Sequence, residues 1–554
     1  MRLSKERETG ECRSAGPKTP SVQRELEGLI VDVERGDSFF GAIRFDNDIV
    51  DVEERPTRSE AIICPGYIDA HIHIESSMLP PRSFSRVVAP HGTAAVVADP
   101  HEIANVAGMD GIEFMANDAR SAPVDIFFAA PSCVPATPFE TSGAAITAKD
   151  CEALLTRDDF VALGEMMNYP GVIRRDPNIM RKIDIALKRD KPVDGHCPGL
   201  SGQDLSLYIA AGISTDHEST TAQEAREKIE RGMRVFVREG SSARDLEALI
   251  GVEGTFAFCT DDAHVRDLMG RGHMDSILAK AVNEGMDPLR ALRMATANPA
   301  SHYGLPCGTL SPGARAHILV LRDIEDFTPV EVYHGGKLCA RCGTMVTPAH
   351  RKDTPMRFMN ARPIDTRILC PRTPRHVIGA ATGRIVTDHL IDVSEGVSKL
   401  VVVDRHTGRH AACCLMHGLD MPGCAMAQTI AHDSHNIIAT GATDELIMRA
   451  VRRLIELGGG IVACSDDEAE EVPLDIGGLM SSELPERVAE RLEGLEEMLE
   501  HHCVAMEGAM ATLSFMALLV IPHLKLSDMG LFDVDAFAFI DDKDGDRDPH
   551  AKNR

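Results

Sequence analysis

The chain contains no tryptophan, and aromatic residues make up only 4% of its 554 residues. Hydrophobic residues reach 44%, so a large core is available, but it must rest on aliphatic side chains and methionine. No run of about 20 apolar residues could span a membrane. The polar N-terminal segment MRLSKERETGECRSAG also lacks the apolar stretch of a signal peptide. We therefore expect a cytoplasmic protein with no membrane partner.

Positive charge is scarce as well. The chain has 58 Lys and Arg residues against 85 Asp and Glu residues, which gives a formal net charge of -27. Such a surface repels phosphate backbones and anionic lipids, so we expect no nucleic-acid partner. The charge favours solubility and says little about the substrate.

The cysteine pattern excludes a secreted disulfide scaffold. The 15 cysteines are odd in number and irregularly spaced. Cys339 and Cys342 form the one CxxC pair, with neither a second pair nor a nearby HxxxH to complete a zinc ribbon. Free thiols in a reducing compartment are the simpler interpretation.

The length predicts several domains. Short apolar runs separated by turn residues alternate with helical patterns in the middle of the chain, and eight β-runs, from AIICPGYID (61–69) to TFAFCTD (255–261), fit a (β/α)8 TIM-like barrel of α/β class. We predict five parts: a disordered tail (1–24), a flanking β-sandwich (25–63 plus 304–350), the barrel (64–303), a C-terminal α/β domain (351–540) and a charged tail (541–554).

Polar residues stand where the predicted barrel strands end. His71 and His73 follow the first run and point to the same side of an extended chain, so they can hold one cation together. Later runs end with Glu165, His196, His217 and Asp261. Strand ends meet at one mouth of such a barrel. Imidazoles and carboxylates gathered there suit one or two divalent metals, and the series predicts a metal-dependent hydrolase.

Several neighbouring residues are ambiguous. Asp99, His101 and Glu102 follow the second run and could carry protons or contact substrate, but an acidic helix start explains them equally well. Glu75 and Ser76 could contact substrate or cap a helix, and His264 has the same ambiguity. A lone histidine at a strand end is more often structural, so the prediction depends on the whole series.

Longer strings carry a family resemblance. The chain resembles the adenine deaminase family of the amidohydrolase superfamily over roughly residues 60–540, in these strings: PGYIDAHIHIESSMLPP (65–81), DPHEIANVAG (99–108), GEMMNYPGV (164–172), DGHCPGLSG (194–202), GISTDHESTTAQEA (212–225), CTDDAHVRDL (259–268), AHDSHNIIATG (431–441) and IPHLKLSDMGLFDV (521–534). One departure is Ala316-His317, where such enzymes usually carry Ala-Asp.

The resemblance implies a binuclear metal site bridged by Glu165, with manganese as the metal and iron or zinc as possible occupants. The implied ligands are His71, His73, Glu165, His196, His217 and one Asp of the TDD motif. We favour Asp261 over Asp262, because Asp261 directly closes the strand. The implied substrates are adenine and water, and the implied assembly is a homodimer.

The expected reaction is hydrolysis of adenine to hypoxanthine and ammonia by attack of a metal-bound hydroxide on C6. The amine leaves only when protonated, and Asp261, His101 and Glu102 are the candidates for that proton transfer. We predict substrate contacts from Glu75, Ser76, Asp99, His264 and His435. His73-Ile74-Glu75 resembles the HxE of zinc cytidine deaminases, but no PCxxC follows. The alternatives are another amidohydrolase acting on a cyclic amide or related base, and an inactive scaffold protein.

Overall fold

The computed structural model describes residues 23–540, except residues 242, 348–354, 366, 368, 370–374, 382–383 and 503–507. The predicted C-terminal tail lies outside the described residues, as does nearly all of the N-terminal tail. The first strand already begins at Arg24, inside the predicted N-terminal tail. Among the described helices, none is both long and apolar enough to cross a membrane.

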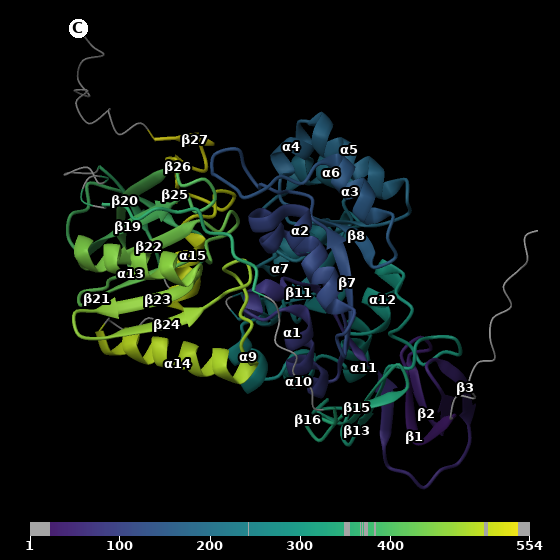
Figure 1. Ribbon diagram of the computed structural model, residues 1–554. Coiled ribbons are helices and arrows are strands. Elements are labelled where there is room, and N and C mark those ends of the chain that lie inside the picture. The colour runs from purple at the N-terminus through teal and green to yellow at the C-terminus, as the bar shows by residue number, and fades with distance from the viewer. Residues whose placement is uncertain are drawn as a thin grey trace, which may run out of the picture.

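Eight parallel strands form the barrel in the middle of the chain (Figure 1). They are β5 (Tyr67–Ile72), β6 (Thr93–Ala98), β7 (Asp125–Ala130), β8 (Phe160–Met166), β9 (Val193–Gly195), β10 (Thr215–Asp216), β11 (Arg234–Arg238) and β12 (Ala257–Cys259). Strands β5–β9 and β10–β12 form two hydrogen-bonded groups, which parallel bridges connect at Val193–Ile213 and Ile72–Asp261. Every predicted β-run thus contributes to the barrel, although the first run also contains a strand of another sheet.

Apolar side chains that alternate along the strands fill the barrel interior. One buried cluster contains Ile68 and Ala70 of β5, Ala95 and Val97 of β6, and Phe236 of β11. Side chains two residues apart point to the same face of a strand, so these residues share the inside of the barrel. The many alanines leave room for the few large side chains.

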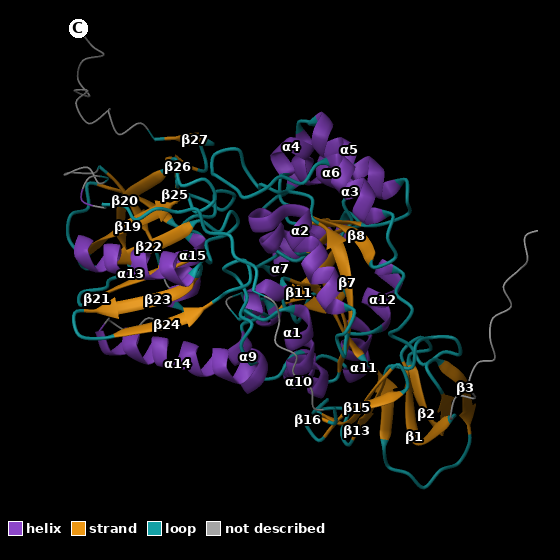
Figure 2. Cartoon of the chain, viewed as in Figure 1, coloured by secondary structure: helices purple, strands orange, loops and turns teal. Residues whose placement is uncertain are grey.

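Helices cover the outside of the barrel (Figure 2). Those that the sequence pattern anticipates are α3 (Ala148–Leu155), α5 (Pro177–Leu187), α6 (Gly202–Ala210), α7 (Ala222–Glu230), α8 (Leu246–Leu249), α10 (Met274–Asn283), α11 (Pro288–Met294) and α12 (Ala297–Tyr303). The structure adds η1 (Ile74–Ser77), α1 (Pro81–Val88), η2 (Ala89–His91), α2 (His101–Ala119), α4 (Tyr169–Ile173) and α9 (Val265–Gly270).

Strands from both sides of the barrel segment share one flanking sheet, shown in purple and teal in Figure 1. Its order is β16-β15-β14-β13-β4-β1-β2-β3. The bounds are β1 (Arg24–Asp32), β2 (Asp37–Phe45), β3 (Ile49–Glu54), β4 (Ile62–Pro65), β13 (Ile318–Leu321), β14 (Pro329–His334), β15 (Lys337–Arg341) and β16 (Thr344–Met345). The predicted boundary between residues 63 and 64 therefore falls inside β4.

His317, the departure from the family pattern, lies where this sheet meets the barrel. Its Nε2 is 3.0 Å from Oδ2 of Asp125, the first residue of β7, and its Nδ1 accepts the backbone N–H of Gly335 at 3.1 Å. Because Nδ1 is an acceptor, the ring proton sits on Nε2 and is donated to Asp125. His317 thus joins the flanking sheet to the barrel and takes no part in chemistry at the opposite mouth.

The C-terminal domain packs beside the barrel and is drawn in green and yellow in Figure 1. Its large sheet has the order β18-β17-β20-β19-β22-β21-β23-β24, and a small sheet has the order β25-β26-β27. The bounds are β17 (His376–Gly379), β18 (Asp388–Ile391), β19 (Val397–Val403), β20 (Ala411–His417), β21 (Cys424–Gln428), β22 (Ile437–Gly441), β23 (Gly460–Ser465), β24 (Ala469–Pro473), β25 (Leu524–Ser527), β26 (Gly530–Asp533) and β27 (Ala538–Phe539), with helices α13 (Asp444–Leu457), α14 (Pro485–His502) and α15 (Ala509–Phe515).

Candidate active site

The predicted metal-binding residues meet at the carboxyl end of the barrel. His71 lies near the end of β5 and Glu165 lies in β8. His73, His196 and His217 directly follow strands, and Asp261 lies two residues after the end of β12. The Nε2 atoms of His71 and His73 are 3.2 Å apart. His73 Nε2 lies 3.1 Å from both Glu165 Oε1 and Asp261 Oδ1. The structure therefore brings together residues that are separated by up to 190 positions in the sequence.

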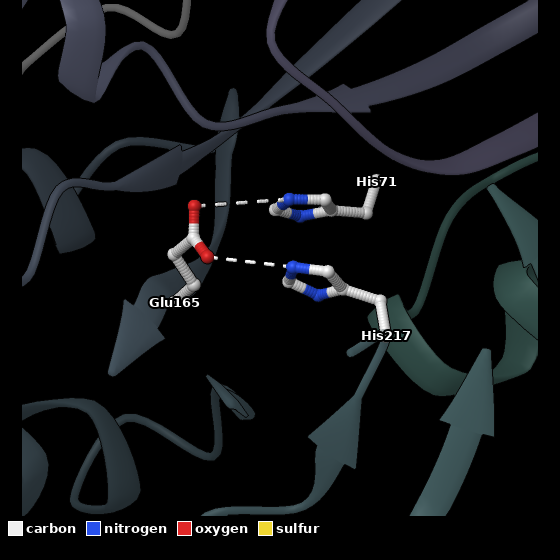
Figure 3. A group of neighbouring side chains, drawn as sticks. All are labelled: His71, Glu165 and His217. Carbon is white, nitrogen blue, oxygen red and sulfur yellow. Dashed lines mark ion pairs between the residues drawn. The ribbon is translucent and has the colours of Figure 1, made fainter. Parts of the chain in front are cut away.

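Glu165 lies at the centre of this cluster. Its Oε1 faces His73 and is 3.9 Å from His71 Nε2, whereas its Oε2 is 2.6 Å from His196 Nδ1 and 3.4 Å from His217 Nε2. Figure 3 shows the carboxylate against the rings of His71 and His217, which stack with centroids 4.2 Å apart. The two oxygens of Glu165 therefore face different histidines of the cluster.

The two aspartates of the TDD motif have different surroundings. Asp261 Oδ1 is 3.4 Å from His71 Nε2, and its Oδ2 accepts a hydrogen bond from Arg238 at 3.0 Å. Its backbone has φ of 59° and exchanges hydrogen bonds with the backbone around His71 and His73. Asp262 Oδ1 instead accepts from Ser76 Oγ at 2.5 Å. The placement favours Asp261 as the metal ligand.

The donor set fits divalent cations. All these side chains are nearly or fully buried, and Nε2 of both His196 and His217 has no hydrogen-bond partner within the described part of the chain. Burial alone would raise the pKa of Glu165, but His196, His217 and His73 hold it well below its usual value. His73 Nδ1 faces the carbonyl of Asp99 at 3.0 Å, which leaves its Nε2 lone pair free for a metal. Buried imidazole and carboxylate ligands of this kind can bind a divalent metal.

His101 and Glu102 begin α2 at the edge of the cluster. His101 Nδ1 is 3.3 Å from Glu165 Oε1, and its Nε2 is 3.5 Å from Glu102 Oε1. Glu102 also contacts the C-terminal domain: its Oε1 is 2.8 Å from His432 Nδ1, and its Oε2 contacts His435 Nε2. Glu102 is thus where the C-terminal domain meets the predicted metal centre.

His435, a predicted substrate contact, is buried behind Glu102. The backbone N–H of Ala431 approaches its Nδ1 at 3.3 Å, so the ring proton sits on Nε2 and is donated to Glu102. Burial lowers the pKa of His435 well below its usual value, which keeps the ring neutral. This geometry fits a residue that orients Glu102.

Two other predicted contacts also hold neighbouring groups in place. Asp99 Oδ2 accepts the backbone N–H of Glu165 at 2.9 Å, and Glu75 Oε1 accepts the backbone N–H of Ile103 at 3.1 Å. Burial, together with the charge of Glu102, raises the pKa of Glu75 to about 7. Neither residue lines the cavity described next. Ser76 and His264 line a smaller adjoining cavity.

A cavity opens over the cluster between the barrel and the C-terminal domain. The barrel side includes His101, Glu102 and Glu165. The opposite side is supplied by the C-terminal domain and is mostly apolar, from Ile385, His432, Asp433, Phe515, Leu518, Val520 and Ile521. The rings of Phe515 and His432 stack with centroids 5.1 Å apart and planes inclined by 19°. The site therefore needs both domains.

Sequence reasoning missed a buried charge network beneath the cluster. The Arg238 guanidinium contacts Glu218 and is 3.0 Å from Asp245 Oδ2 as well as from Asp261. Glu218 Oε1 is in turn 3.4 Å from His217 Nε2. The signals were present: Glu218 directly follows His217, and Arg238 ends β11 directly after the apolar residues Val235, Phe236 and Val237.

Comparison with known proteins gives consistent matches. A model of the amidohydrolase family matches residues 62–339, and a model of the adenine deaminase C-terminal domain matches residues 380–538. An adenine deaminase of Methanothermobacter thermautotrophicus is 44% identical over 86% of this chain and 91% of its own length. One of Salinibacter ruber is 43% identical over 90% of this chain and 94% of its own length.

Solved structures resemble the chain more distantly. A dihydropyrimidinase from Brevibacillus agri covers 59% of this chain and 96% of its own, with 12% identity and a TM-score of 0.45. A structure titled as an amidohydrolase covers 57% of this chain and 98% of its own, with 15% identity and a TM-score of 0.43.

Proposed function

Because the chain belongs to the adenine deaminase family of the amidohydrolases, we propose that it hydrolyses adenine to hypoxanthine and ammonia. One observation carries the proposal beyond family membership. The buried histidine–carboxylate cluster opens into a cavity whose other wall comes from the adenine deaminase C-terminal domain. This arrangement places a flat apolar surface opposite a centre that can activate water.

We propose that His71, His73, Glu165, His196, His217 and Asp261 would hold a binuclear manganese site, with Glu165 as the shared ligand. A divalent cation bound there would lower the pKa of a water molecule, so that a nucleophile would be available near neutral pH. Arg238 fixes Asp261 from behind, and Asp99 fixes the backbone of Glu165. Such outer contacts orient the ligands.

The chain also has groups for proton transfer. The amine on C6 leaves only after protonation, which requires an acid–base group whose pKa lies near the working pH. His101 lies between Glu165 and Glu102, at 3.3 and 3.5 Å, and both His101 and Glu102 line the cavity. We assign proton transfer to this pair. Asp261 is the third candidate, but Arg238 already occupies one of its oxygens.

Ammonia release tests the proposed function. The manganese-loaded protein is incubated separately with adenine, adenosine, guanine and cytosine, and the protein stripped of metal is the control. We expect release from adenine that depends on added metal. Turnover of another base with adenine inert would mean that the chain is an amidohydrolase of different specificity.

Glu165→Gln tests the bridging ligand. Glutamine keeps the size of the side chain but removes its charge and one acceptor oxygen. We expect loss of bound manganese, measured by elemental analysis, together with loss of turnover. Full metal occupancy and normal turnover in this variant would exclude Glu165 as the bridge. The dimeric assembly and the cytoplasmic location stay predictions from the sequence.

A further inference from the structure

One polar side chain on the cavity wall is unaccounted for by the proposed reaction. Asp433 lies in the loop between β21 and β22 of the C-terminal domain and is only 4% exposed. Asp433 lines the cavity, and its buried Oδ2 has no hydrogen-bond partner among the described residues. This contrasts with Glu102, whose oxygens are both engaged by histidines.

A buried polar atom without a hydrogen-bond partner destabilises the folded protein. Such atoms are rare in folded proteins, and one that faces a cavity is best explained by a ligand that supplies the missing partner. The C-terminal side of the cavity also contains the apolar residues Leu518, Val520 and Ile521, whereas the charged groups that act on Asp433 include His101 and Glu102 of the barrel. The other polar side chain that the C-terminal domain contributes to this lining is His432, whose Nδ1 already faces Glu102 Oε1 at 2.8 Å.

The orientation of adenine follows from its chemistry. C6 must lie toward Glu165 and Asp261, where water is activated. N3 is directly across the six-membered ring from C6, and N9–H is its neighbour on the same edge. This edge therefore faces away from the barrel, toward the C-terminal domain, while the stacked rings of Phe515 and His432 offer a surface for the flat face.

We propose that Asp433 binds the N3/N9 edge of adenine and selects the free base over purines substituted at N9. This inference rests on the proposed function. A protonated carboxyl group has one donor and one acceptor, which match the acceptor N3 and the donor N9–H. Burial, opposed by His101 and reinforced by Glu102, raises the pKa of Asp433 and so favours that form. A substituent on N9 removes the donor and collides with the carboxyl group.

The test compares adenine with 9-methyladenine, which lacks the N9–H. Ammonia release is measured with the manganese-loaded wild type, Asp433→Ala and Asp433→Asn. We expect Asp433→Ala to lower kcat/KM for adenine about 10–100-fold, as for loss of two hydrogen bonds. Activity on 9-methyladenine should not fall and should rise, because alanine removes the carboxyl group with which the N9 methyl group collides. Asp433→Asn should keep the wild-type preference, because an amide has the same donor and acceptor pair.

Other outcomes overturn the inference. An equal loss on both substrates in Asp433→Ala would mean a structural role. A fall in kcat on both substrates in Asp433→Asn, with KM unchanged, would mean a role in proton transfer. Titration calorimetry with the same two bases repeats the comparison without turnover, and an unchanged preference in Asp433→Ala would also refute it. Wild-type protein that binds adenine through Asp433 but releases no ammonia would refute only the proposed function.

Discussion

Replacement of Gly164 by alanine should damage the active site without touching any of its ligands. Gly164 lies in β8 directly before Glu165. A Cβ atom at this position would lie 2.2 Å from Asp99 Oδ2, whereas ordinary contacts are 3.4–4 Å. Asp99 must therefore move by roughly 1 Å, because the backbone of a central barrel strand has little room to shift.

That displacement reaches three groups at once. Asp99 Oδ2 accepts the backbone N–H of Glu165, its carbonyl faces His73 Nδ1, and its Oδ1 is 3.7 Å from His101 Nδ1. A misplacement of about 1 Å can cost about 10²-fold in rate, which corresponds to about 2.7 kcal/mol of transition-state stabilisation. Overpacking adds about 1–3 kcal/mol of destabilisation, so the melting temperature should also fall.

The assay is steady-state ammonia release from adenine, with bound manganese and thermal unfolding measured on the same samples. Gly251→Ala is the matched control, because a Cβ atom there meets nothing within 4 Å. We expect the control to behave like the wild type. If Gly164→Ala retains wild-type kcat and metal content, Asp99 is not the support that the geometry indicates.

Three further outcomes follow from buried charges and from the metal. Lys228→Met removes the buried partner that lies 2.8 Å from Asp216 and should lower the free energy of unfolding by about 3–5 kcal/mol. The control Arg231→Met removes the exposed ion pair with Glu227 at the end of the same helix and should lower it by well under about 1 kcal/mol. Burial lowers the pKa of Lys525 to about 7. Between this pH and the usual lysine pKa, unfolding takes up a proton, so the free energy of unfolding should rise with pH. Urea titrations of Lys525→Met at several pH values should show a weaker dependence of this free energy on pH. Removal of metal by a chelator should lower the melting temperature of the wild type reversibly but leave Glu165→Gln unaffected; a drop of equal size in both proteins would contradict the site.

The local sequence pattern was sufficient to predict which side chains gather in the candidate metal-binding cluster. His71 and His73 share a side because side chains alternate along a strand, and their Nε2 atoms indeed lie 3.2 Å apart. Glu165, His196 and His217 could be placed because parallel strands in a barrel present their carboxyl ends at one mouth. In each case the position at a strand end could be predicted from the local sequence, and the barrel topology then brings the strand ends together.

The hydrophobic pattern gave a wrong boundary where one apolar segment contains strands of two different sheets. AIICPGYID reads as one continuous run, but β4 pairs with β1 and β13 in the flanking sheet, and β5 then pairs with β6 in the barrel. Apolar alternation is the same in both sheets, so the sequence does not mark the change of partner. For His101 and Glu102 the sequence left a helix start open beside a functional role, and the structure begins α2 at these residues, with a break in the helix at Gly108, whose φ is 58°.

The cavity wall was the least predictable part, because its residues have no local signature. Glu102 and His435 touch across 333 positions of sequence. Phe515, Leu518, Val520 and Ile521 form an apolar stretch that resembles any core segment, and only domain packing turns it toward the barrel mouth. Asp433 differs from these residues by being an ionisable group in such surroundings. A buried carboxyl group held there against its desolvation cost is the observation on which the proposed role of the C-terminal domain, recognition of the base, depends.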